Sequence, residues 1–112
     1  MNKLADLLKH MQEDIWDIET FIEDMSLELF DTDNKTKKAV CMSLINIGEL
    51  AKNLPKEFKE KHKEIPWKLV TGMRDVTAHR YHSMSVEDIW KTVKEDIQPL
   101  KKAIEEELRG NK

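Results

Sequence analysis

The stretch LADLLKHMQEDIWDIETFIEDM, residues 4–25, decides the fold class. Its apolar residues recur at alternating steps of four and three, the spacing of one helix face over about three heptads; they are Leu4, Leu8, Met11, Ile15, Ile18, Ile22 and Met25. We expect Trp16 and Phe21 to widen this apolar face. The stretch therefore predicts a long amphipathic helix that packs through one seam, followed by a break around residues 25–33.

A second long helix is expected from Asp33 or Asn34 to about Asn53, where Leu54-Pro55 stops it. Its apolar residues form two rows: Val40, Leu44, Ile47, Ala51 and Leu54 in one, and Cys41, Ile45 and Gly48 in the other. So wide an apolar arc belongs either to a helix central in its own bundle or to one shared with a second subunit. Glu49 shares a stripe of this helix with Met42, Asn46 and Asn53. It lies either at a solvated edge or facing a site.

Shorter segments complete the chain. A connector or single turn anchored by Phe58 is expected next, and then a helix with Pro66 as its first residue. Ser85 is expected to cap the last helical region, which Pro99 kinks or restarts and Gly110 ends. With only 3 Gly and 3 Pro and 37% charged residues, the composition favours helices over a sheet. The predicted fold class is all-α.

Length and charge bound the architecture further. The 112 residues predict one domain, 1–110, with a short tail at 111–112. Cys41 has no partner for a disulfide, and neither a signal peptide nor an apolar run of membrane-spanning length is visible, so we expect a cytoplasmic protein without a membrane span. The net charge of −3 hides an acidic first third and a basic middle. The basic middle either meets a polyanion or neutralises the acidic helix within one bundle.

The most reactive side chains gather in RDVTAHRY, residues 74–81. On a helix Arg74 and Tyr81 share one stripe, whereas Asp75 and His79 share another, where the Asp75 carboxylate can accept a hydrogen bond from the imidazole. Arg74 and His79 are about 140° apart around such a helix. They can meet on one phosphate only if the helix ends or distorts near Ala78, or if a second chain supplies one of them.

These residue types suit cleavage of RNA without a metal, because a histidine can move the proton of a ribose hydroxyl or leaving oxygen while arginine stabilises charge on the phosphate. A structural alternative makes Arg74 and Asp75 an ion pair and His79 a helix C-terminal cap. A metal site on Asp75, His79 and His82 is a weaker alternative, since no second ligand cluster accompanies it. His10 and His62 are expected at the surface, and the three tryptophans in the core.

Three further sequence blocks accompany the motif. INIGELAKNLPKEF, IPWKLVTGMRD and VEDIWKTVKEDIQPLK occur in this order around it. Together with RDVTAHRY, these blocks resemble the HEPN domain family, and within it the HepT-type toxins of HepT/MntA toxin-antitoxin pairs. The resemblance covers nearly the whole chain and retains every motif residue.

The resemblance implies an antiparallel bundle of four to five helices that forms a homodimer, with both motifs in one cleft at the interface. It implies a metal-independent endoribonuclease toxin of a type VII-like pair, with Arg74 and His79 catalytic, Asp75 supporting and no cofactor. The implied partners are RNA and an MntA-like nucleotidyltransferase antitoxin that silences the toxin by adenylylation of Tyr81. Two alternatives are a non-catalytic subunit that binds a nucleotide or substrate for a nucleotidyltransferase, and a plain helical dimerisation module.

Overall fold

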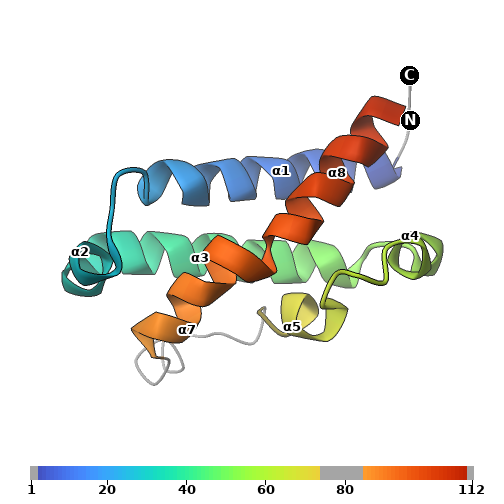
Figure 1. Ribbon diagram of the computed structural model, residues 1–112. Coiled ribbons are helices and arrows are strands. Elements are labelled where there is room, and N and C mark those ends of the chain that lie inside the picture. The colour runs from blue at the N-terminus through green and yellow to red at the C-terminus, as the bar shows by residue number, and fades with distance from the viewer. Residues whose placement is uncertain (1–2, 74–84, 111–112) are drawn as a thin grey trace.

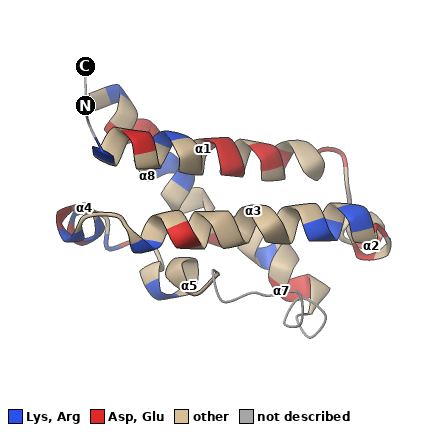
Figure 2. Ribbon diagram, turned by 180° about the vertical axis from the view of Figure 1, so that it is seen from behind, with Lys and Arg blue, Asp and Glu red and all other residues tan. Residues whose placement is uncertain are grey.

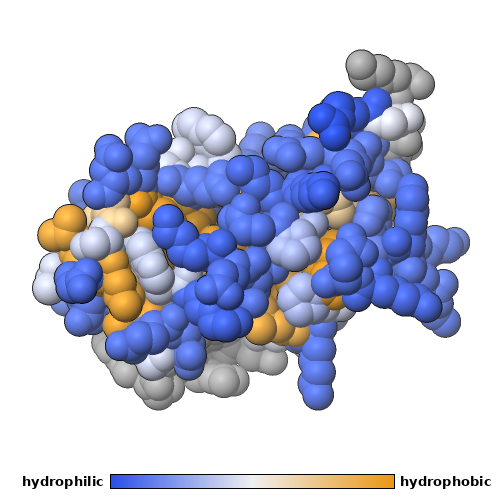
Figure 3. Space-filling view, in the orientation of Figure 1, coloured by the Kyte–Doolittle hydropathy of each residue, from blue (hydrophilic) through white to orange (hydrophobic). Residues whose placement is uncertain are grey.

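The computed structural model describes residues 3–73 and 85–110. Every regular element in these ranges is helical, which confirms the predicted all-α fold class. None of the helices in the described part of the chain is long and apolar enough to span a membrane. Figure 3 shows hydrophilic residues over most of one face, with apolar residues reaching the surface in smaller areas.

Two long helices form the centre of the molecule. Helix α1 (Lys3–Phe21) and helix α3 (Asn34–Lys52) run antiparallel and pack along their length (Figure 1). The seam predicted for the first helix is confirmed, because its middle residues are buried in the core: Leu8, Met11, Ile15, Ile18 and Ile22. Leu4 and Met25 at the ends of the seam are partly buried against the same core.

The prediction that Trp16 and Phe21 widen the apolar face is wrong. The Trp16 side chain is 65% exposed and Phe21 is 39% exposed. Trp16 follows the buried Ile15 directly, so it is turned about 100° around the helix, away from the seam. Glu13, one helical turn before Trp16, and the adjacent Asp17 are charged, which is the pattern of a solvated face.

Helix α1 ends earlier than predicted, and the expected break contains a helix. Asp24 has φ 65°, a left-handed conformation that stops the α1 ladder after a final turn. Helix α2 (Leu27–Thr32) then begins, with the Ser26 hydroxyl accepting a hydrogen bond from the Leu29 amide at 3.2 Å. Phe30 of α2 is fully buried and its ring centroid lies 5.2 Å from that of Trp90.

Helix α3 begins and ends where predicted. The Asp33 carboxylate accepts hydrogen bonds from the Thr36 amide at 3.0 Å and the Thr36 hydroxyl at 2.8 Å, which caps the helix. Most of both apolar rows is buried within the single chain, since Cys41 and Gly48 are buried together with the first row, whereas Ile45 is only half-buried. Helix α3 is thus central in its own bundle, packed on α1, on α2 and on the segment after Pro66. Glu49 is exposed.

The expected connector contains helix α4 (Lys56–Lys61), and Phe58 is its buried anchor as predicted. Helix α5 (Trp67–Gly72) begins one residue later than predicted, with Pro66 as its cap. His62, expected at the surface, is only 8% exposed. Its ring lies 4.7 Å from the Phe58 ring, because the turn after α4 folds the imidazole inward.

The C-terminal part crosses the long helices on one face (Figure 1). Helix α7 (Val86–Lys91) continues into a π-helical segment, η2 (Thr92–Asp96), and helix α8 (Gln98–Gly110) follows after the single residue Ile97. This confirms that the segment restarts at Pro99, whose missing N–H and ring prevent a continuous α-helical ladder. The Gln98 side chain donates to the Val93 carbonyl at 3.3 Å within the irregular segment.

Charge is arranged as the sequence indicates, with acidic positions along α1 and basic positions at both ends of α3 (Figure 2). The ion pair that joins α1 to the rest of the bundle, however, is made with a lysine of α8. The Lys101 ammonium lies 3.0 and 3.1 Å from the two carboxylate oxygens of Glu19. A second ion pair, Lys61 with Glu107 at 3.3 Å, joins α4 to α8.

Candidate functional site

The predicted site residues belong to one segment, and that segment lies outside the described residues. Arg74, Asp75, His79 and Tyr81, together with His82 of the alternative metal site, fall within residues 74–84. What the structure describes is the frame from which this segment departs and to which it returns. The frame consists of α5 before the motif and α7 after it.

The entry to the motif is anchored in the core. Val70 is fully buried and Met73, the last described residue before Arg74, is 6% exposed. The Trp67 indole N–H donates to the carbonyls of His62 at 2.9 Å and Lys59 at 3.1 Å, which ties the start of α5 to the end of α4. The chain therefore reaches the motif from a fixed position.

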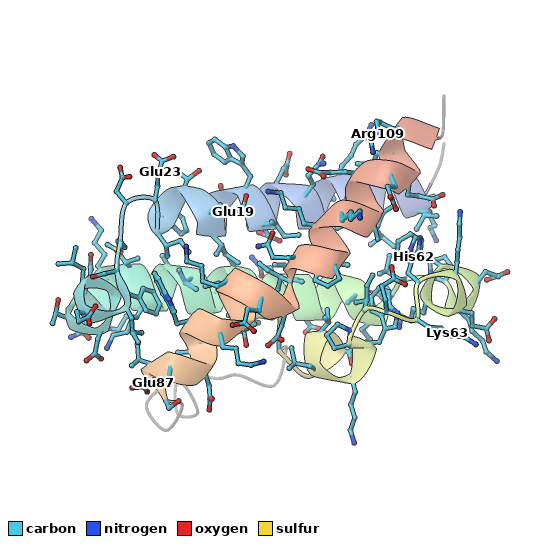
Figure 4. All side chains as sticks on the ribbon, in the orientation of Figure 1. Glu19, Glu23, His62, Lys63, Glu87 and Arg109 are labelled. Carbon is cyan, nitrogen blue, oxygen red and sulfur yellow. The ribbon has the colours of Figure 1, made fainter. Side chains whose placement is uncertain are left out.

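The exit from the motif is fixed by a helix cap. The Ser85 hydroxyl accepts a hydrogen bond from the Asp88 amide at 3.0 Å, as the Ser-x-x-Asp pattern predicts. Ile89, in the first turns of α7, is 1% exposed, and Trp90 packs on Phe30 of α2. Glu87 marks this helix start in Figure 4.

The two helices of the frame, α5 and α7, lie on the same side of the molecule. In Figures 1 and 2, α5 and α7 both lie on the side of α3 that faces away from α1. Helix α5 packs on α3, and α7 packs on α2. The described chain thus leads into the motif and resumes after it on the side of the bundle opposite to the acidic helix.

Lysines outnumber acidic residues in the stretch of sequence that precedes the motif. Between the end of α3 and the middle of α5 the lysines are Lys52, Lys56, Lys59, Lys61, Lys63 and Lys68, against Glu57, Glu60 and Glu64. Lys63, in the connection between α4 and α5 (Figure 4), and Lys68 of α5 are exposed. Their positive potential favours the approach of a polyanion toward the entry of the motif.

The described titratable groups with shifted pKa values lie in supporting positions. Burial raises the pKa of the Cys41 thiol to about 11, which keeps it protonated and poorly nucleophilic. The hydrogen bonds from Thr36 lower the pKa of Asp33 at the α3 cap. Burial raises the pKa of Asp14, although a hydrogen bond with Asn46 acts in the other direction. In residues 3–73 and 85–110, no group of three His, Cys, Asp or Glu side chains is arranged to hold a metal ion.

Comparison with known proteins connects this frame to a family. Residues 11–107 match the family described as Ribonuclease HepT-like, a range that includes α2 to α7, most of α1 and α8, and the whole motif. The chain belongs to the HepT-like ribonuclease family. Membership confirms the resemblance drawn from the motif and its flanking blocks, and the all-helical bundle is consistent with a HEPN-like architecture.

Similar proteins carry ribonuclease names. A protein of Thermococcus cleftensis named "Probable ribonuclease HepT" is 46% identical over 96 residues, 86% of this chain and 87% of its own. A "Putative RNase" of Methanocaldococcus jannaschii is 40% identical over 106 residues, 95% of this chain and 84% of its own. A "Gamma-glutamylcyclotransferase and putative RNase" of that organism is 40% identical over 94% of this chain but only 49% of its own length. No solved structure gives a significant match.

Proposed function

We propose that the protein is a metal-independent endoribonuclease in which Arg74 and His79 perform the chemistry. The observation that carries this proposal is membership of the HepT-like ribonuclease family over a range that contains the whole motif. His79 removes a proton from the ribose 2′-hydroxyl or returns one to the leaving oxygen, and Arg74 stabilises the charge that develops on the phosphate. Asp75 accepts a hydrogen bond from His79 and holds its tautomer.

The proposed catalytic unit is a homodimer of the domain 1–110, with the two motifs in one cleft. If the motif is helical, Arg74 and His79 of a single chain are about 140° apart around the helix. A two-fold arrangement relieves this separation, because each centre can take one residue from each chain. The lysines of α4 and α5 support the proposal, since they give a polyanionic strand a path toward the entry of the motif.

Cleavage of RNA in the presence of EDTA tests the reaction and its independence of metal together. The parent protein is expected to cut RNA under these conditions, and His79→Ala and Arg74→Ala are expected to lose cleavage by at least about a hundredfold while remaining folded. His10→Ala is the matched control, because His10 is an exposed histidine on α1. Cleavage at the parent rate by both motif variants would remove Arg74 and His79 from the mechanism.

Control of the nuclease is proposed to act through Tyr81. The partner is a nucleotidyltransferase antitoxin that transfers AMP from ATP to the phenol oxygen and releases pyrophosphate. The AMP adds bulk and negative charge, which on a helix would lie on the same stripe as Arg74. The toxin-antitoxin role predicts a nucleotidyltransferase reading frame beside this one. Labelled ATP and that enzyme should label the parent protein and silence cleavage, whereas Tyr81→Phe should stay unlabelled and active. Labelling of Tyr81→Phe would place the modification elsewhere.

A further inference from the structure

A hollow on the other side of the molecule has no part in the proposed reaction. It lies between α1 and α8, has a volume of about 670 Å³, and is lined by Trp16 and Ile15 together with charged side chains of both helices. Ile15 is 2% exposed and belongs to the core, whereas Trp16 is 65% exposed. The hollow thus has an exposed indole ring beside the buried Ile15.

Trp16 differs from the other two tryptophans of the chain. The Lys59 ammonium lies 6.0 Å from the centre of the Trp67 ring, and the Lys94 ammonium lies 5.2 Å from that of Trp90. Within the described residues, no lysine or arginine is placed over Trp16 in this way. Its aromatic face is therefore open to a cation from outside the chain.

The charges around Trp16 have the sign that attracts such a cation. Glu13, Asp17, Glu19 and Glu105 line the hollow, and Lys101 is the only basic residue that lines it in the described structure. Lys101 is already engaged, since both oxygens of Glu19 lie within 3.1 Å of its ammonium. The remaining carboxylates make the hollow negative, and an indole ring beside them adds cation–π attraction.

We propose that this hollow is a docking site for an arginine- or lysine-bearing segment of a protein partner. A basic side chain stacks on the Trp16 ring and its charge is neutralised by Asp17 and Glu105, with guanidinium favoured because it is planar and less strongly hydrated than ammonium. Exposed tryptophan is also a common anchor of protein interfaces. The site lies on α1 and α8, apart from the α5–α7 frame, so it is independent of the proposed catalysis.

Other occupants fit the hollow less well. RNA is a polyanion and would place phosphates against carboxylates. A second copy that docked through the same face across a two-fold axis would set acidic residues against acidic residues, because the same patch lies on both sides of such an interface. A basic segment is the occupant whose charge complements the lining.

Binding of a short capped oligo-arginine peptide to the whole protein tests the proposal, measured by calorimetry at low salt. Trp16→Ala should weaken binding about fivefold, the loss expected for a cation–π contact of about 1 kcal/mol. Leu29→Ala is the matched control, since Leu29 is 56% exposed and lies outside the hollow. The double variant Asp17→Asn with Glu105→Gln should also weaken binding. An oligo-glutamate peptide of equal length should not bind.

Three results would overturn this assignment. Equal affinity of the peptide for the parent and for Trp16→Ala would mean that the peptide binds through general charge attraction and does not stack on Trp16. Loss of self-association in Trp16→Ala, seen by sedimentation, would make a second copy the occupant. Loss of affinity for a short single-stranded RNA in the same variant would make RNA the occupant. Trp16→Phe, which keeps an aromatic face, should bind the peptide with intermediate affinity and provides a second measure if Trp16→Ala folds poorly.

Discussion

His62 shows how a single side chain can depart from its sequence context. It stands between Lys61 and Lys63, a pattern typical of a solvated surface, yet it is buried against Phe58. Its Nδ1 atom lies 3.5 Å from a Glu64 oxygen, whereas its Nε2 atom has no hydrogen-bond partner among the described residues. The burial comes from the turn after α4, which charge patterning does not reveal.

Two replacements of His62 should distinguish how its packing and how its polar nitrogen affect stability. His62→Leu is expected to be at least as stable as the parent, because it fills the same space and removes a buried nitrogen that has no partner among the described residues. His62→Ala should lower the free energy of unfolding by about 2 kcal/mol through the hole left beside Phe58. Denaturant unfolding measures both. Equal destabilisation by the two variants would show that the imidazole nitrogen makes a stabilising hydrogen bond.

Asp14 should make stability depend on pH in a defined direction. Burial raises its pKa in the folded protein, so its favourable contribution is present below the unfolded pKa and is lost as the pH rises through the folded value. Asp14→Asn keeps a side-chain acceptor for Asn46 and removes the charge. The variant should be more stable than the parent at about pH 7, with a difference that shrinks toward about pH 3, below the ordinary aspartate pKa.

Denaturant unfolding of Asp14→Asn and the parent at both pH values measures this difference. Asn46→Ala in the Asp14→Asn background is the control for the hydrogen bond itself. A variant that is less stable than the parent at neutral pH would mean that the ionised carboxylate is stabilising at this position.

At the scale of helices, the long periodic elements and the starts of the short helices α5 and α7 were predictable, whereas the short helix α2 was not. The boundaries of α3 follow from the Asp33 cap and the Leu54-Pro55 stop, which act through local hydrogen bonds and sterics. Helix α2 was missed because it has six residues and relies on Phe30 burial against Trp90, a contact distant in sequence. Short helices depend on tertiary packing more than on their own propensity.

The cap of α7 should affect stability and the nuclease together, because α7 begins directly after the motif. Ser85→Ala removes the acceptor for the Asp88 amide and should lower the free energy of unfolding by about 1 kcal/mol. Ser85→Asp, which retains a capping acceptor, should stay close to the parent. Thermal unfolding and RNA cleavage of both variants measure the effect. Equal loss in both would mean that the hydroxyl has another role.

At the scale of the whole molecule, the sequence predicted the helical bundle and the family but not the distribution of apolar surface. The wide apolar arc of α3 was open to two interpretations, and the structure buries most of it within one chain under α1, α2 and α5, with Ile45 left half-buried. Burial of most of the arc within one chain weakens it as an argument for a second subunit. The proposed dimer now depends on the spacing of Arg74 and His79 and on family membership.

Mixed dimers test directly whether one catalytic centre is shared between two chains. Arg74→Ala and His79→Ala, each inactive alone, are co-expressed and assayed for RNA cleavage in EDTA. If each centre takes Arg74 from one chain and His79 from the other, half of the dimers contain one intact centre, and about a quarter of the parent rate should return. An inactive mixture whose mixed dimers are demonstrated by mass spectrometry, beside an active parent, would contradict a centre built from two chains.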